Sequence, residues 1–350
     1  MNLIQAKHLP ALLALLLFPV CVYSQKQPLY TEKVADPRIK SVQLYREGWN
    51  LSYPVIKLSN QEKLVLHFDL LSDDPEIYYY TFLLCDRNWG ESTAFPSDYL
   101  SGITENQIED YKPSFGTKIN YYHYKISFPN ERVSLKVSGN YIVKVYRQDD
   151  PDNPLVIKRF MVTEDLAVVD AGVTRPQIAA FYNTGQQVNF TVKFPSLRVV
   201  DPYREITSSI LQNGQWTTAK TNLNPDFVGS GEVRYNSLSE KNIFLAGSEF
   251  RYFDIKSIRY QSEYIRMIDF KDDIYHVFLM PSENRAGKPY FYWQDFNGKY
   301  YVAVQEGRNM DTDADYVRVY FTLPSMYELR GGRLYVWGER SNWQFELKTR

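Results

Sequence analysis

Cysteine is scarce in this chain. The 350 residues include two cysteines, and Cys21 lies in an apolar N-terminal segment that we expect to be removed. With Cys85 alone left, no intramolecular disulfide can form, so the fold depends on core burial, which a chain of this length permits. Cys85 ends the apolar run Phe82–Leu84, so we expect a buried, unreactive thiol.

Histidine is equally scarce, and the sequence lacks the usual catalytic motifs. Beyond the N-terminal segment His67, His123 and His276 remain, each alone within a strand-like pattern and without metal-ligand spacing. No G-x-S-x-G elbow and no phosphate-binding glycine loop is present. The acidic run Asp311–Asp315 starts like a calcium loop but has Tyr316 where the turn needs glycine. We therefore assign no catalytic, cofactor-binding or metal-binding residue, although paired glycosidase carboxylates stay open.

The chain also lacks a charge excess of either sign. The formal net charge is −1, and removing the N-terminal segment with Lys7 and no acidic residue changes it to −2. Nucleic acids and anionic membrane surfaces attract strongly basic proteins, so neither is expected as a partner.

No hydrophobic run is long enough to cross a membrane as a helix. The longest, Leu9–Val20, is shorter than the ~20 residues that a spanning helix needs. It follows Lys7 and precedes the small-residue pair Val22 and Ser24, which is the pattern of a secretory signal peptide. We expect a signal peptide over residues 1–24, cleaved after Ser24, and no membrane insertion of the exported protein. Lipid attachment at Cys21 is the alternative, but the preceding residues lack the small side chain that such sites need.

Helical periodicity is absent beyond a few turns, whereas strand patterns are abundant. The stretch Phe128–Val162 contains the alternating run from Val133 to Ser138, the β-branched and aromatic run Tyr141–Arg147, and the run Leu155–Val162. Gly139 turns the chain before the second run, and an Asp- and Pro-rich loop precedes the third. Such an arrangement is typical of the last strands of an immunoglobulin-like sandwich.

We therefore predict an all-β protein made of tandem immunoglobulin-like β-sandwich domains. The first domain is expected over residues 25–164 and the second over residues 165–315. Residues 316–350 would begin an incomplete third β domain or add strands to the second. Within the first domain Glu91–Thr117 is a long excursion with weak periodicity, and we expect it to contact a partner.

Other strands and turns follow from the same patterns. Lys63–Leu71 alternates, with Leu64, Leu66, Phe68 and Leu70 on one face, and Ile77–Cys85 is expected to pair beside it. Later in the chain we expect strands at Gln187–Phe194, Glu205–Leu211, Phe250–Tyr260, Asp273–Met280, Val317–Leu323 and Gly332–Gly338, and two aromatic strands within Lys288–Val304. Asn213–Gly214 and Asn297–Gly298 are hairpin signals.

The abundant aromatic residues permit two interpretations. Twenty-nine tyrosines and 20 phenylalanines suit strands with packed bodies and wet ends. Sugar-binding modules use exposed aromatic platforms, and Trp293, Trp337 and Trp343 stand among tyrosines in that manner. A secreted polysaccharide-binding module is therefore an alternative function.

Five stretches resemble a known family. SVQLYREG (Ser41–Gly48), TFLLCDRNW (Thr81–Trp89), SGNYIVKVY (Ser138–Tyr146), FRYFDIKSIRY (Phe250–Tyr260) and GRLYVWGERSNW (Gly332–Trp343) are similar to segments of the type IX secretion system plug family of Bacteroidota. These stretches contain no catalytic residues, and they are distributed along most of the chain.

The resemblance implies a non-enzymatic subunit in the periplasm, associated with the outer membrane. Such a protein would dock on the periplasmic mouth of the outer-membrane translocon barrel and seal the pore when no cargo is crossing. It would need no cofactor and no small-molecule ligand. The family continues beyond the GRLYVWG segment with further strands, so we expect this chain to be a C-terminally shortened member.

Overall fold

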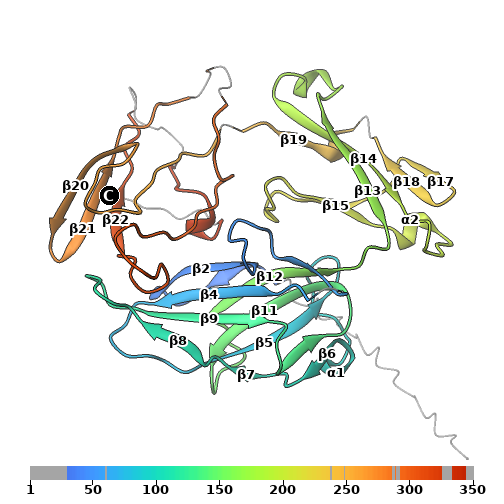
Figure 1. The fold of residues 1–350 in the computed structure, drawn as a ribbon. Helices are drawn as coiled ribbons and strands as arrows, with labels where there is room; N and C mark the ends of the chain where they lie inside the picture. Colours follow the sequence, from blue (N-terminus) through green and yellow to red (C-terminus); the bar gives the residue numbers. More distant parts are fainter. Residues whose placement is uncertain are drawn as a thin grey trace, which may run out of the picture.

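The computed structural model describes residues 30–343, apart from residues 60, 237–238, 248, 286–287, 289–291 and 325–332. The predicted signal peptide, residues 1–24, lies outside the described residues. Within them no helix has the length and apolar composition that crossing a membrane requires. The chain forms an N-terminal sandwich, with a middle lobe and a C-terminal lobe side by side above it in Figure 1.

The N-terminal sandwich consists of two mainly antiparallel sheets. One has the order β1 (Lys33–Val34), β12 (Val156–Thr163), β11 (Gly139–Arg147), β5 (Tyr78–Cys85) and β7 (Asn106–Gln107), with β3 (Val55–Lys57) parallel to β12. The other has the order β2 (Ile39–Arg46), β4 (Leu64–Leu70), β9 (Tyr122–Phe128) and β8 (Asp110–Pro113). A small pair, β6 (Leu100–Gly102) and β10 (Val133–Leu135), follows the short helix α1 (Pro96–Tyr99).

Aromatic rings from both sheets fill the space between them. Phe82 of β5 and Phe128 of β9 lie 4.6 Å apart between ring centroids, and Phe160 of β12 lies 5.1 Å from Phe128. Tyr141 of β11 stacks on Phe160 at 5.3 Å. All four rings are at most 1% exposed. The predicted β-sandwich fold is confirmed for this part of the chain, whereas its immunoglobulin-like character stays a prediction.

The strands predicted within Phe128–Val162 are present as β10, β11 and β12, and β11 pairs with β12 as an antiparallel hairpin. The predicted neighbour of the β4 strand is wrong. β5 pairs with β11 in the opposite sheet, while β4 lies between β2 and β9. The linker between β4 and β5 crosses from one sheet to the other, which strand patterns alone do not show.

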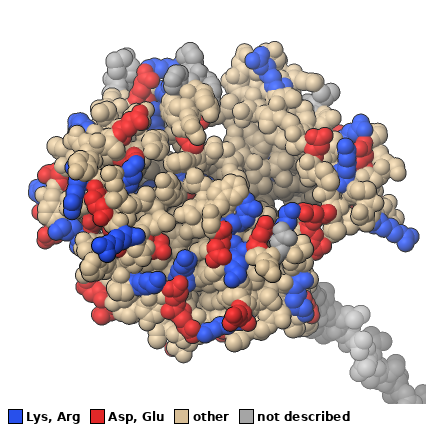
Figure 2. Space-filling model, viewed as in Figure 1, with Lys and Arg blue, Asp and Glu red and all other residues tan. Residues whose placement is uncertain are grey.

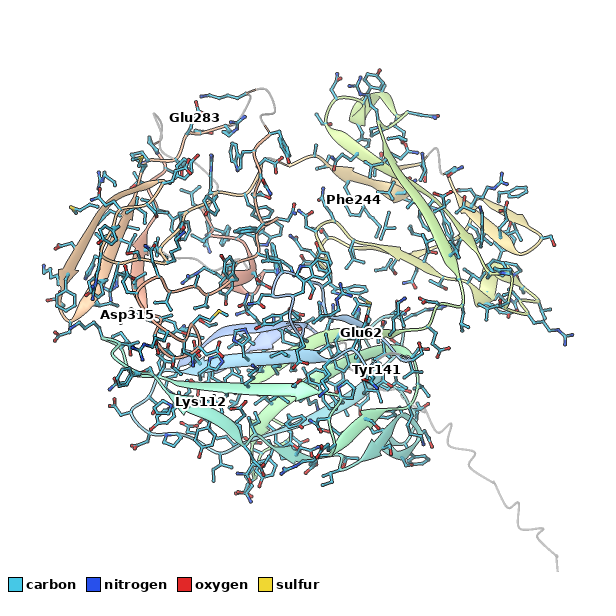
Figure 3. The ribbon with its side chains drawn as sticks, viewed as in Figure 1. Glu62, Lys112, Tyr141, Phe244, Glu283 and Asp315 are labelled. Carbon is cyan, nitrogen blue, oxygen red and sulfur yellow. The ribbon has the colours of Figure 1, made fainter. Side chains whose placement is uncertain are left out.

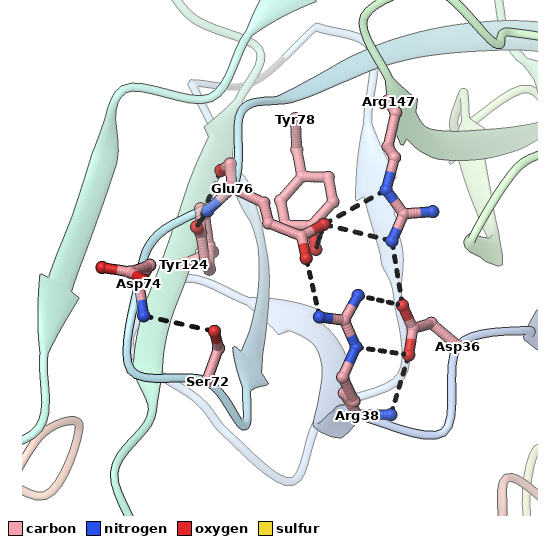
Figure 4. A network of polar contacts seen from close by, with 8 residues as sticks. All are labelled: Asp36, Arg38, Ser72, Asp74, Glu76, Tyr78, Tyr124 and Arg147. Carbon is pink, nitrogen blue, oxygen red and sulfur yellow. Dashed lines mark hydrogen bonds and ion pairs between the residues drawn. The ribbon is translucent and has the colours of Figure 1, made fainter.

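An ion-pair network at one end of the sandwich joins its two sheets (Figure 4). Arg38, next to β2, lies 2.8 Å from both Asp36 and Glu76, and Arg147 at the end of β11 contacts the same two carboxylates at 3.0 and 3.1 Å. The hydrogen bond from Arg38 lowers the pKa of Asp36 to about 2. The Tyr78 hydroxyl also donates to Glu76, so one carboxylate is held from both sheets.

The middle lobe has one larger sheet and a small hairpin packed on it. The larger sheet has the order β13 (Val168–Thr174), β14 (Gly185–Lys193), β18 (Glu232–Tyr235) and β17 (Phe227–Gly229), with β19 (Ile243–Leu245) also on β14. β15 (Ser208–Ile210) and β16 (Lys220–Leu223) form the hairpin, which follows the short helix α2 (Pro202–Glu205). The predicted turn at Asn213–Gly214 is present, with φ of 53° and 69°.

The C-terminal lobe contains fewer strands than the sequence predicts. β20 (Ile265–Lys271), β21 (Ile274–Leu279) and β22 (Val317–Tyr320) form one sheet, with β22 parallel to β21. Phe250–Tyr260 contains no strand, and neither do the described residues of Lys288–Val304, although Asn297–Gly298 does turn with φ of 52° and 76°. Gly332–Gly338 is partly outside the described residues and otherwise contributes an isolated bridge at Val336.

The sheet of β20, β21 and β22 contains residues on both sides of the predicted domain boundary at position 315. The predicted domain boundaries remain a proposal. Figure 2 shows acidic and basic side chains interspersed over the visible face, without a large patch of one sign.

Candidate functional site at the lobe junction

The strand β4 is buried on both faces, although its sequence alternates. Leu66 and Phe68 point into the sandwich core, and His67 and Asp69 on the opposite face are each 6% exposed. The C-terminal lobe covers that opposite face. Side chains of the sandwich and of the C-terminal lobe meet there, and we call this set of residues the polar junction. It comprises Ser41, Gln43, His67, Asp69, Tyr121 and His123 of the sandwich and Lys299, Tyr300, Asp311, Tyr316 and Glu339 of the C-terminal lobe.

Asp69 is the centre of the polar junction. One carboxylate oxygen lies 2.7 Å from His123 Nδ1 in the neighbouring strand, and the other accepts a hydrogen bond of 2.6 Å from the Tyr316 hydroxyl. Burial raises the pKa of the Tyr316 phenol well above its usual value, so this group remains a donor. The Tyr316 hydroxyl also lies 2.7 Å from Ser41 Oγ. A buried carboxylate with partners from both bodies fixes their relative position.

Backbone groups extend the same contact. The Asp315 carboxylate accepts from the Lys118 backbone N–H at 2.6 Å, and Figure 3 shows Asp315 where the C-terminal lobe approaches the sandwich. The Tyr121 hydroxyl donates to the carbonyl of Ala314 at 3.0 Å, and Phe115 N–H donates to the Thr312 carbonyl at 2.9 Å. Residues 312–316 are therefore docked as a unit.

Two further side chains close the junction at its other end. Gln43 is 2% exposed and donates to the Tyr300 carbonyl at 2.6 Å and to Glu339 at 3.1 Å. Lys299 donates to the carbonyls of Leu51 and Ser52, and its ammonium lies 4.5 Å from the centroid of the Tyr53 ring. Burial lowers the pKa of Lys299, and these carbonyls satisfy its charge.

The middle lobe is joined to the sandwich by a stacked cation. The Arg159 guanidinium lies 4.5 Å from the Trp89 ring of the sandwich and 5.7 Å from Trp216 of the middle lobe. Its burial lowers the pKa of Arg159, and Nε donates to the Tyr30 carbonyl at 2.8 Å. Gly214 lets the backbone approach the sandwich, because a Cβ there would lie 2.1 Å from the ring of Tyr53.

The structure corrects the interpretation of the histidines as isolated residues. The rings of His67 and His123 lie 5.3 Å apart on adjacent strands, while His276 contacts the Tyr320 hydroxyl in the C-terminal lobe. The available signal was the spacing of His67 and Asp69, which places both on one strand face. Pairing of that face with the strand containing His123 is long-range information that the spacing does not contain.

The polar junction places two carboxylates near the His123 ring. Nε2 of His123 faces another carboxylate, Asp311, at 3.9 Å. Among the described residues no group of three or more His, Cys, Asp or Glu side chains is placed to hold a metal ion. In the acidic run, Asp313 accepts backbone N–H groups of Arg308 and Asn309 and so shapes its own loop.

The structure also shows what surrounds the three tryptophans and the cysteine considered in the sequence. Trp337 and Trp343 pack at 75° to each other with centroids 5.2 Å apart, and both contact the Phe250 ring. Trp293 Nε1 donates to the carbonyl of Phe250, so the three tryptophans gather around this residue. Cys85 is buried as expected, and burial raises the pKa of its thiol to about 12.

The segment Glu91–Thr117 is part of the sandwich and not a detachable loop. It contributes β6, β7 and β8, two of which extend the main sheets. Tyr99 is 3% exposed and anchors it, whereas Phe95, Ile103 and Phe115 are 74%, 56% and 80% exposed. The segment thus presents large apolar side chains from an ordered base, and whether it contacts a partner stays a proposal.

Replacement of His67 by phenylalanine is expected to reduce the acid sensitivity of the protein. Burial, followed by the charges of His123 and Lys125, lowers the pKa of His67 to about 3. Because this is below the unfolded value of ~6.5, the unfolded chain binds more protons, and stability falls as the pH falls below about 6.5. Between pH 7 and 5 the wild-type protein should lose ~2 kcal/mol more unfolding free energy than His67→Phe.

Urea unfolding of both proteins at a series of pH values measures this difference. Neither ring nitrogen of His67 has a hydrogen-bond partner among the described residues, so phenylalanine breaks no bond there. The comparison above pH 7, where the stability difference should be constant, is the control. Parallel stability curves down to pH 5 would contradict the prediction.

Comparisons with known proteins agree with the all-β architecture and identify the family. Residues 39–164 match the first domain of the type 9 secretion system plug protein. The structure is similar to the crystal structure, at 2.30 Å resolution, of a hypothetical protein from Parabacteroides merdae ATCC 43184. The TM-score is 0.86 and the sequence identity 30%, with 92% of this chain and 81% of that chain covered. No curated protein matches the chain. The chain belongs to the type IX secretion system plug family.

Proposed function

We propose that this protein is a non-enzymatic periplasmic subunit that docks on the periplasmic mouth of the type IX translocon barrel and seals its pore when no cargo is crossing. The family match over residues 39–164 carries the proposal. The expected partner is the outer-membrane barrel protein, bound by surface complementarity without cofactor or small ligand. Export of the chain by the predicted signal peptide would place it in the periplasm.

The lobe junctions support a sealing role on physical grounds. A pore seal has to keep its shape while it covers an opening, and independent domains on flexible linkers do this poorly. Here Asp69 and Tyr316 join the C-terminal lobe to the sandwich through a buried hydrogen bond of 2.6 Å. Arg159 contacts Trp89 of the sandwich and Trp216 of the middle lobe, and the two rings also contact each other, with centroids 4.8 Å apart. The three parts would therefore act as one block.

Crosslinked capture from host outer membranes tests the docking step. The tagged protein should recover one very large barrel protein, identified by mass spectrometry. A deletion strain should become permeable to a large antibiotic that the intact outer membrane excludes, and complementation should restore the barrier. Recovery of no barrel protein together with unchanged permeability would refute the proposal.

Exposed apolar side chains in Glu91–Thr117 provide a sharper test of the contact surface. Deleting the segment would remove β7 and β8, so we use Phe95→Ser combined with Ile103→Ser. Loss of two exposed apolar contacts should lower barrel recovery about tenfold, with little change in stability. Val200→Ser, at an 81% exposed position in the middle lobe, is the matched control. Equal recovery of the double variant and the control would move the contact elsewhere.

A further inference from the structure

The strand β13 forms an open edge of the middle-lobe sheet. It pairs with β14 along its whole length, from Val168 opposite Lys193 to Thr174 opposite Gln187. No other described strand pairs with it. Figure 1 shows the two long strands β13 and β14 side by side in the right-hand lobe. All seven β13 residues are exposed.

The open edge lacks the protection that other edges of this protein have. β8 has Asp110, Lys112 and Pro113 along its length, and charges and proline discourage further strand addition. β1 and β17 are short, with two and three residues. β13 is longer, contains no proline or lysine, and carries Asp170 as its one charge. An exposed, unprotected edge strand is a template for pairing with another strand.

One face of β13 continues the core of the middle lobe. Val169, Ala171 and Val173 lie directly opposite Val192, Phe190 and Val188 of β14, so the two sets share a face. Phe190 is 5% exposed and belongs to the core, but Val169 and Val173 are 61% and 65% exposed. The hairpin of β15 and β16 covers the core only in part. A strand added at the edge would extend the backbone ladder and shelter this apolar face.

The sequence of β13 is compatible with pairing to itself. Two copies of β13 can pair in antiparallel orientation about a two-fold axis. Their apolar faces then lie on the same side of the joined sheet only when the axis passes through a residue position. An axis at Asp170 would place two carboxylates opposite each other. An axis at Gly172 would pair Val169 with Arg175 and shorten the match. An axis at Ala171 uses all seven residues and opposes no like charges.

In the register centred on Ala171, each Val169 lies opposite Val173 of the second copy, and the two Ala171 residues face each other. On the other face Asp170 lies opposite Gly172, which has no side chain to clash, and a Cβ built on Gly172 meets no atom within 4 Å. We propose that β13 is a self-association edge, through which a second copy of this chain adds its own β13 in antiparallel orientation about Ala171. The proposal goes beyond docking on the translocon and does not depend on it.

A seven-residue strand pair is a small interface, so the dimer is expected to be weak and concentration-dependent. Cysteine crosslinking detects such a dimer and reports its register. In the exported protein Cys85 is the native thiol, and its burial keeps it out of the reaction. Ala171→Cys should form a disulfide-linked dimer under mild oxidation, because facing residues of an antiparallel pair meet the distance that a disulfide needs.

The neighbouring positions give matched controls. Asp170→Cys and Gly172→Cys alone should each give at least about tenfold less linked dimer than Ala171→Cys, since neither faces itself across the axis. A mixture of the Asp170→Cys and Gly172→Cys proteins should form the mixed disulfide. Sedimentation equilibrium should show reversible dimers in the wild-type protein, and Val169→Lys should abolish them while the exposed position keeps the fold intact.

Three outcomes would overturn the proposal. The first is a wild-type protein that stays monomeric at about 100 µM while Ala171→Cys crosslinks no faster than the controls. The second is equal crosslinking at all three cysteine positions, which would show collision without register. The third is a wild-type protein that stays monomeric together with a Val169→Lys variant that recovers less of the barrel protein. The β13 edge would then bind a different protein and not a second copy of this chain.

Discussion

Asp69→Ala is expected to lower the free energy of unfolding by ~3–5 kcal/mol, because it removes the shared partner of two buried polar side chains and leaves both without that hydrogen-bond partner. The lost carboxylate contacts both His123 and Tyr316, and all three groups lie between the sandwich and the C-terminal lobe. Urea unfolding followed by tyrosine and tryptophan fluorescence measures the effect.

The contribution of the lobe contact can be separated by a double-mutant cycle. Tyr316→Phe removes the hydroxyl that contacts both Asp69 and Ser41 and should cost ~1–3 kcal/mol. Both Asp69→Ala and Tyr316→Phe remove the hydrogen bond between these two side chains, so together they should cost less than the sum of the single changes. Tyr182→Phe, at a 48% exposed tyrosine, is the control and should change stability by less than ~0.5 kcal/mol. A cost below ~1 kcal/mol for Asp69→Ala would show that the polar junction does not fix the lobes.

Phe160→Ala is the second large expected effect, with a loss of ~3–5 kcal/mol. The Phe160 ring is fully buried and contacts Phe82 at 5.7 Å, Phe128 at 5.1 Å and Tyr141 at 5.3 Å. These neighbours come from both sheets, so they cannot all move into the vacated volume. The remaining cavity adds to the lost burial of the ring.

Thermal and urea unfolding test this prediction. Should the alanine variant not fold, Phe160→Leu should remain folded with a cost of ~1–1.5 kcal/mol. Phe95→Ala, at a phenylalanine that is 74% exposed, is the matched control with an expected change within ~0.5 kcal/mol. A loss below ~1 kcal/mol for Phe160→Ala would mean that the sheets close over the gap.

Local pattern was sufficient where strands and turns are formed by neighbouring residues. The hairpin of β11 and β12 and the strands β4 and β14 lie within or close to their predicted ranges. Asn213–Gly214 and Asn297–Gly298 turn as predicted, since their positive φ angles are properties of the residues themselves.

Pattern failed where tertiary contacts replace strand pairing. The described part of Lys288–Val304 lacks strands, and Lys299 and Tyr300 within it instead donate hydrogen bonds to Ser52 and Glu339. A β-rich, aromatic composition is equally compatible with a strand and with an extended segment lying on another domain. Local preference does not distinguish the two, because the decisive partners are more than 200 residues away along the chain for Lys299.

The sequence alone determined that the chain is β-rich and rich in aromatic residues, and that five of its stretches resemble the plug family. The tertiary structure decided which faces of the sheets are covered. The alternation in β4 predicts that Leu66 and His67 point to opposite sides of the sheet, but it does not predict that both sides are buried. Only the packing of the C-terminal lobe places Tyr316 on Asp69 and the adjacent strand places His123 there. Likewise, pairing on one side alone makes β13 an open edge, because strand propensity specifies a strand but not its neighbours.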